Sequence, residues 1–198
     1  MPKPARFKVD PKLTALLGEG YRSSEEALKE LVDNAWDADA DTVTITLPGI
    51  LDGDPIVIED DGTGMTEKEV REEYLRIASD RTSRKGDRSL LKKRKVKGRK
   101  GIGKFAGLMA AHEMRTETWT EGTRTLVCIT KPDLLAAQKR AVDLERVELP
   151  VATNSTSPDL HGTRITLSGL NQKFQIPSAE KLRALLMREY GKIGRAHV

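Results

Sequence analysis

Two glycine-rich turns constrain what this chain can fold into more than any other feature. An Asp-x-Gly-x-Gly turn at residues 60–64 follows a β-branched run, and a Gly-x-x-Gly-x-Gly turn at residues 98–103 precedes an apolar stretch. Paired glycines let the backbone approach a ligand closely, and a carboxylate held there accepts hydrogen bonds from an amine or water. Backbone N–H groups at a helix start, helped by a lysine, form an anion site. The first turn alone is more often an ordinary strand-to-helix connection.

The second turn nearly matches two known phosphate-binding motifs, and we exclude both. A Walker-type loop needs Ser or Thr after its Gly-Lys pair to hold magnesium, and this chain has Phe105 there. The dinucleotide fingerprint, which Gly101, Gly103 and Ala106 imitate, requires a preceding strand. A basic stretch precedes the turn instead.

An acidic helix is predicted ahead of the first turn. Ser23 and Glu26 form a capping-box pattern, which marks the helix start. Glu30, Asn34 and Asp37 recur at helical spacing, so three oxygen-bearing side chains share one face. On its own this helix is typical of a solvated acidic face.

Like-charge pairs on that helix, Glu26 with Glu30 and Asp33 with Asp37, each cost a few tenths of a kcal/mol unless a cation lies nearby. Once the glycine turns are considered, Glu30 and Asn34 become candidates for a site. Asp33 keeps the interpretation of a solvated side chain.

Residues 79–100, between the two turns, are rich in Lys and Arg and have no hydrophobic period. One interpretation is a nucleic-acid-binding segment, although no aromatic residues are interleaved for base stacking. A solvated disordered loop is another. A mobile lid over a polyphosphate is the third, and it alone explains why the stretch lies between two glycine turns.

The remaining pattern predicts an α/β (α+β) two-layer sandwich, with helices on one face of a mixed, mostly antiparallel sheet. Hairpins are expected from strands 41–47 with 55–60 and from strands 115–119 with 124–130. Thr66 and Glu69 form a second capping-box pattern. The other expected elements are short strands at Phe7 and Val9, helices at 13–17, 66–78 and 105–111, a weak strand at 142–149, a polar loop at 153–159 and a strand at 162–167.

Composition narrows the class of protein. At 198 residues the chain is one domain, or one domain with a fragment of a second. Cys128 is the single cysteine, which excludes an intrachain disulfide and a cysteine-based metal site. No apolar run is long enough to span a bilayer, and no signal-peptide core is present. These features predict a cytoplasmic protein without a membrane partner.

The C-terminal end carries a separate signal. A helix is expected from 179 to 190, and the final hexapeptide Ile-Gly-Arg-Ala-His-Val is what a widely used sequencing adapter encodes in one frame. We therefore expect residues 193–198 to be non-native and exclude His197 from any role. The expected organisation is short elements at 1–22, the main domain at 23–170 with its lid at 79–100, and the start of a truncated region at 171–192.

Taken together, the acidic helix, the two turns, the basic stretch between them and a late Gly162-Thr163 resemble the GHKL ATPase superfamily. This superfamily (Bergerat fold) includes gyrase B, the ninety-kilodalton heat-shock chaperone, histidine kinases, MutL and the MORC proteins. The segment from Glu30 to Ala38 looks like the family's first box, residues 60–65 like the second and residues 98–105 like the third. The resemblance covers about residues 23–167.

The resemblance implies ATP and Mg²⁺ as cofactors and a role for each matching residue. Glu30 would be the general base that deprotonates the attacking water, and Asn34 would coordinate magnesium. Asp60 would bind the adenine amino group, with Thr163 supporting it, and Asp37 would support the site through water. The other implied ATP-binding residues are Ala38, Gly62, Gly64, Met65, Gly101, Ile102, Gly103, Lys104 and Phe105.

The branch of the superfamily is inferred from what the chain has and lacks. Histidine kinases of this fold usually lack a carboxylate equivalent to Glu30, and His112 and His161 both follow the first two boxes. We therefore expect hydrolysis that drives lid closure in a larger chaperone-like or MORC-like protein. The alternatives are a histidine-kinase module and a nucleic-acid-binding module with regulatory ATP. A homodimer through a missing C-terminal region and nucleic acid on the basic lid are the other partners considered.

Overall fold

A seven-stranded sheet forms the centre of the computed structural model, which describes residues 5–6, 8–9, 23–49, 53–77, 86–98, 103, 106–132, 148–171, 175–190 and 195–197. Its strand order is β11-β3-β4-β10-β6-β7-β9, and every neighbouring pair is antiparallel except β11 with β3. The strands are β3 (Thr42–Thr46), β4 (Ile56–Asp60), β6 (Ala111–Thr120), β7 (Thr123–Thr130), β9 (Val151–Ser155), β10 (Gly162–Leu170) and β11 (Arg195–His197).

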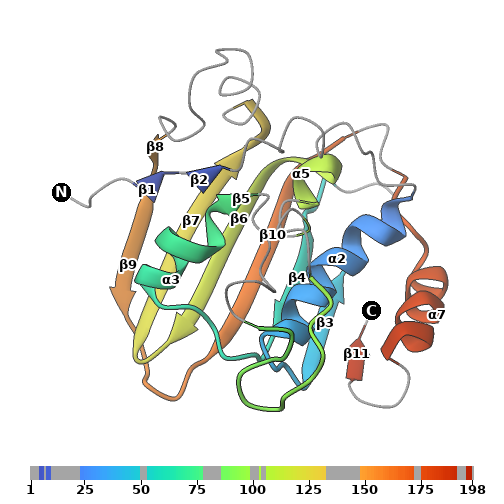
Figure 1. Ribbon diagram of the computed structural model, residues 1–198. Helices are drawn as coiled ribbons and strands as arrows, with labels where there is room; N and C mark the ends of the chain where they lie inside the picture. Colours follow the sequence, from blue (N-terminus) through green and yellow to red (C-terminus); the bar gives the residue numbers. More distant parts are fainter. Residues whose placement is uncertain are drawn as a thin grey trace.

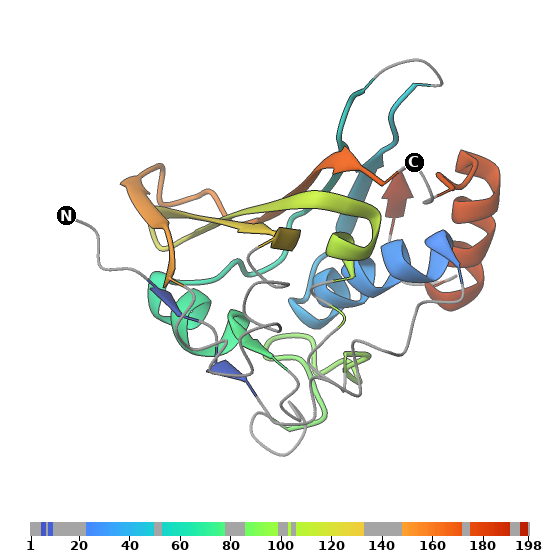
Figure 2. The same cartoon turned by 90° about the horizontal axis from the view of Figure 1, so that it is seen from above.

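Short strand pairs and helices complete the fold (Figure 1). Strand β1 (Ala5–Arg6) pairs with β8 (Glu148–Leu149), and β2 (Lys8–Val9) pairs with β5 (Arg76–Ile77). The helices are α2 (Ser24–Asp37), α3 (Glu67–Glu69), α5 (Gly107–Ala110) and α7 (Ala179–Tyr190), with a π-helical turn η1 (Val70–Tyr74) after α3. Figure 2 shows α2 and α3 on one face of the sheet, which confirms the predicted two-layer sandwich.

Helix α2 begins where the capping pattern predicts. The Ser23 side chain accepts a hydrogen bond from the Glu26 N–H at 3.2 Å, which satisfies one donor of the first turn. Its apolar face is buried against the sheet and carries Ala27, Leu28, Leu31, Val32 and Ala35. Burying that face stabilises the helix more than intrinsic propensity does. Glu30 and Asn34 lie on a different face of the helix, which does not pack on the sheet.

Both predicted hairpins are confirmed. Strands β3 and β4 pair antiparallel, and so do β6 and β7. Strand β10 runs between the hairpins and pairs with both β4 and β6, placing Thr163 opposite Asp60 on one side and Thr118 on the other. The late Gly-Thr motif therefore lies beside the first glycine turn.

The helix predicted for residues 66–78 is shorter and irregular. Its capping box between Thr66 and Glu69 is present, but α3 passes into the π-helical turn η1 and the chain is a strand again at Arg76. The Tyr74 hydroxyl lies 2.9 Å from the Thr116 hydroxyl in the core, and burial raises the pKa of Tyr74 to about 12. Single π-helical turns of this kind are rare and occur frequently at functional sites.

Two other expectations are wrong. The apolar helix expected at 105–111 comprises only Gly107–Ala110, because residues from Ala111 onward pair with β10 and β7. Residues 153–155, expected in a polar loop, belong to the edge strand β9. Four of the five side chains of β9 are exposed. A strand with so little burial does not need alternating apolar residues, which are the pattern that predicts a half-buried strand.

Several expectations fall on residues that the structure does not describe, namely the helix at 13–17, Phe7 and most of the strand at 142–149. The C-terminal helix is confirmed as α7. Among the described residues, no helix has both the length and the apolar character that crossing a membrane requires.

Candidate functional site

Asp60 ends β4 at the point where β4, β10 and the first glycine turn meet. Its Oδ1 accepts a hydrogen bond from the Gly62 N–H at 2.9 Å, so the carboxylate folds back over its own turn. Burial raises the pKa of Asp60 to about 7, and the neighbouring charges of Asp61 and Glu59 raise it further. Hydrogen bonds from the N–H groups of Gly62 and Thr163 lower the pKa and offset part of this rise. A half-buried carboxylate with so high a pKa is a candidate for ligand recognition.

The glycines around Asp60 are required by close backbone approaches. A Cβ on Gly62 would lie 2.8 Å from the carbonyl oxygen of Ala38 at the end of α2, and the Thr63 N–H donates to the same oxygen at 2.8 Å. Gly64 has φ +67 and packs so tightly on Trp119 that a Cβ would overlap the Trp119 carbonyl oxygen. The first turn is therefore packed between α2 and β6.

Met65 and Thr163 are joined through a residue that the motif analysis did not single out. The Met65 N–H donates to Thr118 Oγ1 at 2.8 Å, and the Thr118 and Thr163 hydroxyls lie 3.3 Å apart. Thr118 and Thr163 are buried. The signal in the sequence is a Thr116-x-Thr118 pair, whose spacing puts both hydroxyls on the core face of a strand.

Glu30 and the second glycine turn lie against each other. A Cβ on Gly103 would overlap the Glu30 carboxylate, so a larger residue there would displace this side chain from the turn. One helical turn further on, Asn34 Nδ2 is buried and has no hydrogen-bond partner within the described part of the chain. Buried amides are normally hydrogen-bonded, so this nitrogen has the character of a group that awaits a ligand.

Asp37 connects α2 to the start of the second turn. Its two carboxylate oxygens accept hydrogen bonds from the N–H groups of Lys97 at 2.8 Å and Gly98 at 3.0 Å. The structure pairs Asp37 directly with this backbone, and its action on the site through water stays a prediction. A Cβ on Gly98 would lie 3.1 Å from Asp37 Oδ2, so the turn follows α2 closely.

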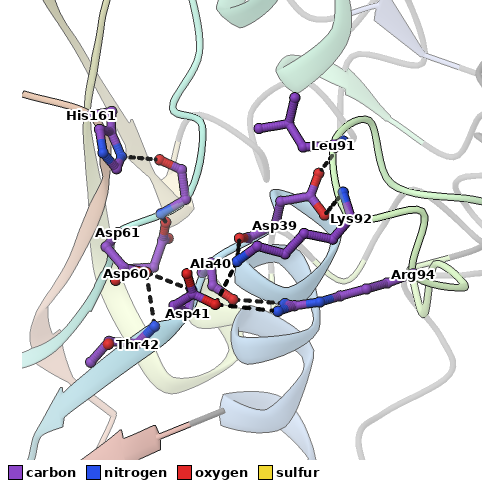
Figure 3. A network of polar contacts seen from close by, with 11 residues as sticks. Asp39, Ala40, Asp41, Thr42, Asp60, Asp61, Leu91, Lys92, Arg94 and His161 are labelled. Carbon is purple, nitrogen blue, oxygen red and sulfur yellow. Dashed lines mark hydrogen bonds and ion pairs between the residues drawn. The ribbon is translucent and has the colours of Figure 1, made fainter. Parts of the chain in front are cut away.

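A second set of aspartates anchors the basic segment (Figure 3). The buried Asp39 carboxylate accepts hydrogen bonds from the N–H groups of Leu91 at 2.7 Å and Lys92 at 3.2 Å. The Lys92 ammonium donates to the Asp39 carbonyl at 2.8 Å and to Asp41 at 2.5 Å. Burial opposes ionisation of Asp39, but hydrogen bonds from Ser89, Leu91 and Lys92 keep its pKa below the usual value.

Asp61, within the first turn, and His161, outside it, connect the turn to its surroundings (Figure 3). Asp61 Oδ1 accepts hydrogen bonds from the N–H groups of Asp41 at 2.7 Å and Thr42 at 2.8 Å. His161 Nδ1 lies 2.9 Å from the Gly62 carbonyl oxygen. These contacts make the end of α2, the start of β3 and the first turn one connected unit.

We expect Asp39→Asn to reduce the free energy of unfolding by about 1–3 kcal/mol at pH 7, because the amide has one acceptor oxygen and one of the two N–H groups of the basic segment would lose its partner. The pKa of Asp39 in the folded state lies below its ordinary value of 3.8, so this contribution is present above about pH 4 and is lost as the pH falls through the folded-state pKa. Chemical denaturation at pH 7 and below pH 4 measures it. The exposed Asp54→Asn is the control, and equal losses in the two variants would contradict the assignment.

The side of α2 next to its acidic face contacts helix α7. Asp33 is buried, accepts a hydrogen bond from the Tyr190 hydroxyl and pairs with Lys29 at 2.8 Å, so its predicted solvated state is wrong. Burial and the Asp33 charge raise the pKa of Tyr190, which keeps the hydroxyl protonated as the donor. The Lys97 ammonium lies 4.1 Å from the Tyr190 ring centre.

The structure thus brings together most of the residues that the sequence singled out. Helix α2 and its end carry Glu30, Asn34, Asp37 and Ala38. The turn from Asp60 to Met65 lies beside that end, and Thr163 lies beside Asp60. Within the described residues, no group of three or more His, Cys, Asp or Glu side chains forms a metal cluster. The predicted site residues Gly101, Ile102, Lys104 and Phe105 lie outside the described part.

Comparison with known families supports the same grouping. The model of the family described as "Histidine kinase-, DNA gyrase B-, and HSP90-like ATPase" matches residues 21–163. The chain belongs to this family. The match includes every motif from Glu30 to Thr163. Residues 21–163 therefore form an ATP-binding domain of this ATPase-like family.

A longer relative is also similar. The chain is 33% identical over 177 residues to a protein of Herpetosiphon aurantiacus named "Putative type II restriction enzyme HgiDII". The matched region is 88% of this chain and 27% of that protein. The chain thus spans about a quarter of the relative's length.

Proposed function

We propose that this domain binds ATP between the two glycine turns and hydrolyses it with Glu30 as the general base. The observation that carries the proposal is the contact between the Glu30 carboxylate and Gly103, which joins the acidic helix to the second turn. The first turn packs on the end of the same helix at Ala38. A single helix thus spans a base-recognition end and a phosphate end.

At the base-recognition end, Asp60 would accept a hydrogen bond from the adenine amino group. Its second oxygen is suited to this role because Oδ1 is already oriented by the Gly62 N–H. Met65, which is half-buried against the core, would provide an apolar contact for the ring, together with Gly64.

At the phosphate end, the N–H groups of the second turn, with Lys104, would hold the phosphates. Glu30 would orient a water molecule and take its proton on the carboxylate as the water oxygen attacks the γ-phosphorus. The bond from the γ-phosphorus to the bridging oxygen breaks, leaving ADP and inorganic phosphate. Asp37 would keep Gly98, and with it the entry to the turn, against α2.

The residues present fit a magnesium ion. Mg²⁺ is commonly held by one or two protein oxygens, substrate phosphates and waters, so a sparse protein donor set is suitable. Asn34 would provide its amide oxygen to the ion, and its buried, unpartnered amide nitrogen would donate a hydrogen bond to a phosphate oxygen. When bound, the ion would neutralise charge on the phosphates.

The cellular context remains a prediction. We infer that the basic lid closes over the nucleotide and that closure drives a conformational change in a larger chaperone-like or MORC-like protein. A cytoplasmic location and a homodimer are further predictions. Three cations within residues 86–98 already have partners in the chain. Lys92 pairs with Asp41, Arg94 stacks on Trp36, and Lys97 pairs with Glu189. These contacts weigh against a nucleic-acid site on these side chains.

The test is to mix the protein with radiolabelled Mg-ATP and to follow both binding and the fate of the γ-phosphate. We expect ATP to bind and the label to appear as free phosphate. Label retained on the protein would favour the kinase alternative. Absence of ATP binding would overturn the proposal.

A second candidate comes from the relative's printed name. We propose that the domain couples ATP to the action of a longer DNA-cleaving protein, because the relative is named as a restriction enzyme. DNA cleavage by a longer protein that contains this chain should then depend on ATP and be lost in Asp60→Asn. Cleavage that is unchanged in that variant would exclude the coupling.

A further inference from the structure

Thr118 connects the elements that surround Asp60. It lies on the core face of β6 and is 1% exposed. Its Oγ1 is 2.8 Å from the Met65 N–H nitrogen, 3.0 Å from the Gly162 carbonyl oxygen and 3.3 Å from Thr163 Oγ1. A side chain on a third strand therefore contacts both motifs that flank Asp60.

The chemistry of a hydroxyl allows one consistent arrangement of these bonds. A threonine hydroxyl has one proton to donate and two lone pairs to accept with. Because Met65 offers an N–H and Gly162 offers a carbonyl, Thr118 accepts from the first and donates to the second. Its remaining lone pair accepts from the Thr163 hydroxyl. Valine has nearly the same shape and can make none of these bonds.

The position of this hydroxyl sets the spacing of the site. Gly64 already packs on the carbonyl of Trp119, the residue after Thr118, so the first turn is held to β6 at two consecutive residues. On the other side, Gly162 packs so closely on the Asp60 carbonyl that a Cβ there would overlap it. Losing the Thr118 hydroxyl would remove one of these two contacts between the turn and β6 while leaving the glycine contacts in place.

We propose that Thr118 is a positioning residue that fixes Met65 and Thr163 relative to Asp60 and thereby sets the width of the adenine site. The proposal rests on the proposed ATP function. Thr118 is at the base-recognition end and contacts none of the phosphate-end residues Glu30, Asn34 or Gly103. It should therefore affect recognition of the base and leave recognition of the phosphates unchanged.

Calorimetry with two ligands tests this division. We expect Thr118→Val to bind Mg-ATP about tenfold more weakly than the wild type, because a buried N–H and a buried carbonyl lose their partner. Mg-tripolyphosphate, which lacks the base, should bind within about twofold of the wild type. Thr118→Ser keeps the hydroxyl and should restore ATP binding to within about threefold.

Thr116→Val is the matched control. Thr116 lies on the same face of β6, is equally buried and bonds to Tyr74 rather than to the glycine turn. It should leave ATP binding unchanged although it also loses a buried hydroxyl. If Thr118→Val fails to fold, Thr118→Cys replaces it, because a thiol is only a weak donor and acceptor. Thr118→Cys should bind ATP more weakly than the wild type and Thr118→Ser.

The outcomes separate the two proposals. If the wild type binds ATP and both Thr118→Val and Thr118→Cys bind it equally well, the role of Thr118 is refuted and the ATP function stands. An equal loss for ATP and tripolyphosphate would also refute it, because the effect would be structural. If the wild type binds no ATP, both proposals fail together.

Discussion

Glu30→Gln is expected to reduce ATP turnover by about 10²–10⁴-fold while nucleotide affinity changes only a few-fold. The substitution keeps the shape of the side chain against Gly103 and removes its capacity to take a proton. Single-turnover phosphate release, measured beside equilibrium binding of ATP, separates the two effects.

Glu26→Gln is the matched control for this prediction. Glu26 lies on the same helix one turn earlier and is exposed. Its substitution by Gln removes the same charge. Its turnover should equal that of the wild type. Wild-type turnover in Glu30→Gln would rule out the assignment of Glu30 as the base, and equal loss in both variants would show that helix charge alone is responsible.

Asp60→Asn is expected to weaken ATP binding by about 100-fold, because the adenine amino group would meet an amide in place of a carboxylate. It should also stabilise the unliganded protein. Folding raises the pKa of Asp60 from 3.8 to about 7, so the native state binds more protons than the unfolded state between these values. Stability therefore falls as the pH rises through this window, and removing the charge should add on the order of 2 kcal/mol at pH 8.

Binding calorimetry and denaturation of Asp60→Asn at pH 5 and pH 8 measure both effects. Glu59→Gln is the control, since Glu59 is adjacent, exposed and paired with Arg164 at 2.9 Å. We expect it to bind ATP as the wild type does, because exposed ion pairs contribute about 0–1 kcal/mol. Strong ATP binding by Asp60→Asn would exclude Asp60 from base recognition, and a pH-independent stability difference would contradict its raised pKa.

Local signals predicted the elements whose formation depends on local interactions. The Ser23 cap, the alternation in β3 and the hairpins are each encoded within a few residues, and all are confirmed. The edge strand β9 and the π-helical turn η1 were missed. The first is stabilised by pairing with β7 and the second by the bond from Tyr74 to Thr116, and both partners are distant in the chain.

The sequence alone determined which turns need glycine, which helix carries the acidic face and which family the chain resembles, because spacing along a helix or through a turn defines a face and a backbone geometry. Only the tertiary structure decided what each acidic residue contacts. Asp33, Asp37 and Asp39 hold other parts of the chain, whereas Glu30 lies against the second turn and Asp60 beside the first. Helical spacing cannot predict this division, because it depends on which strand, helix or loop packs against each face.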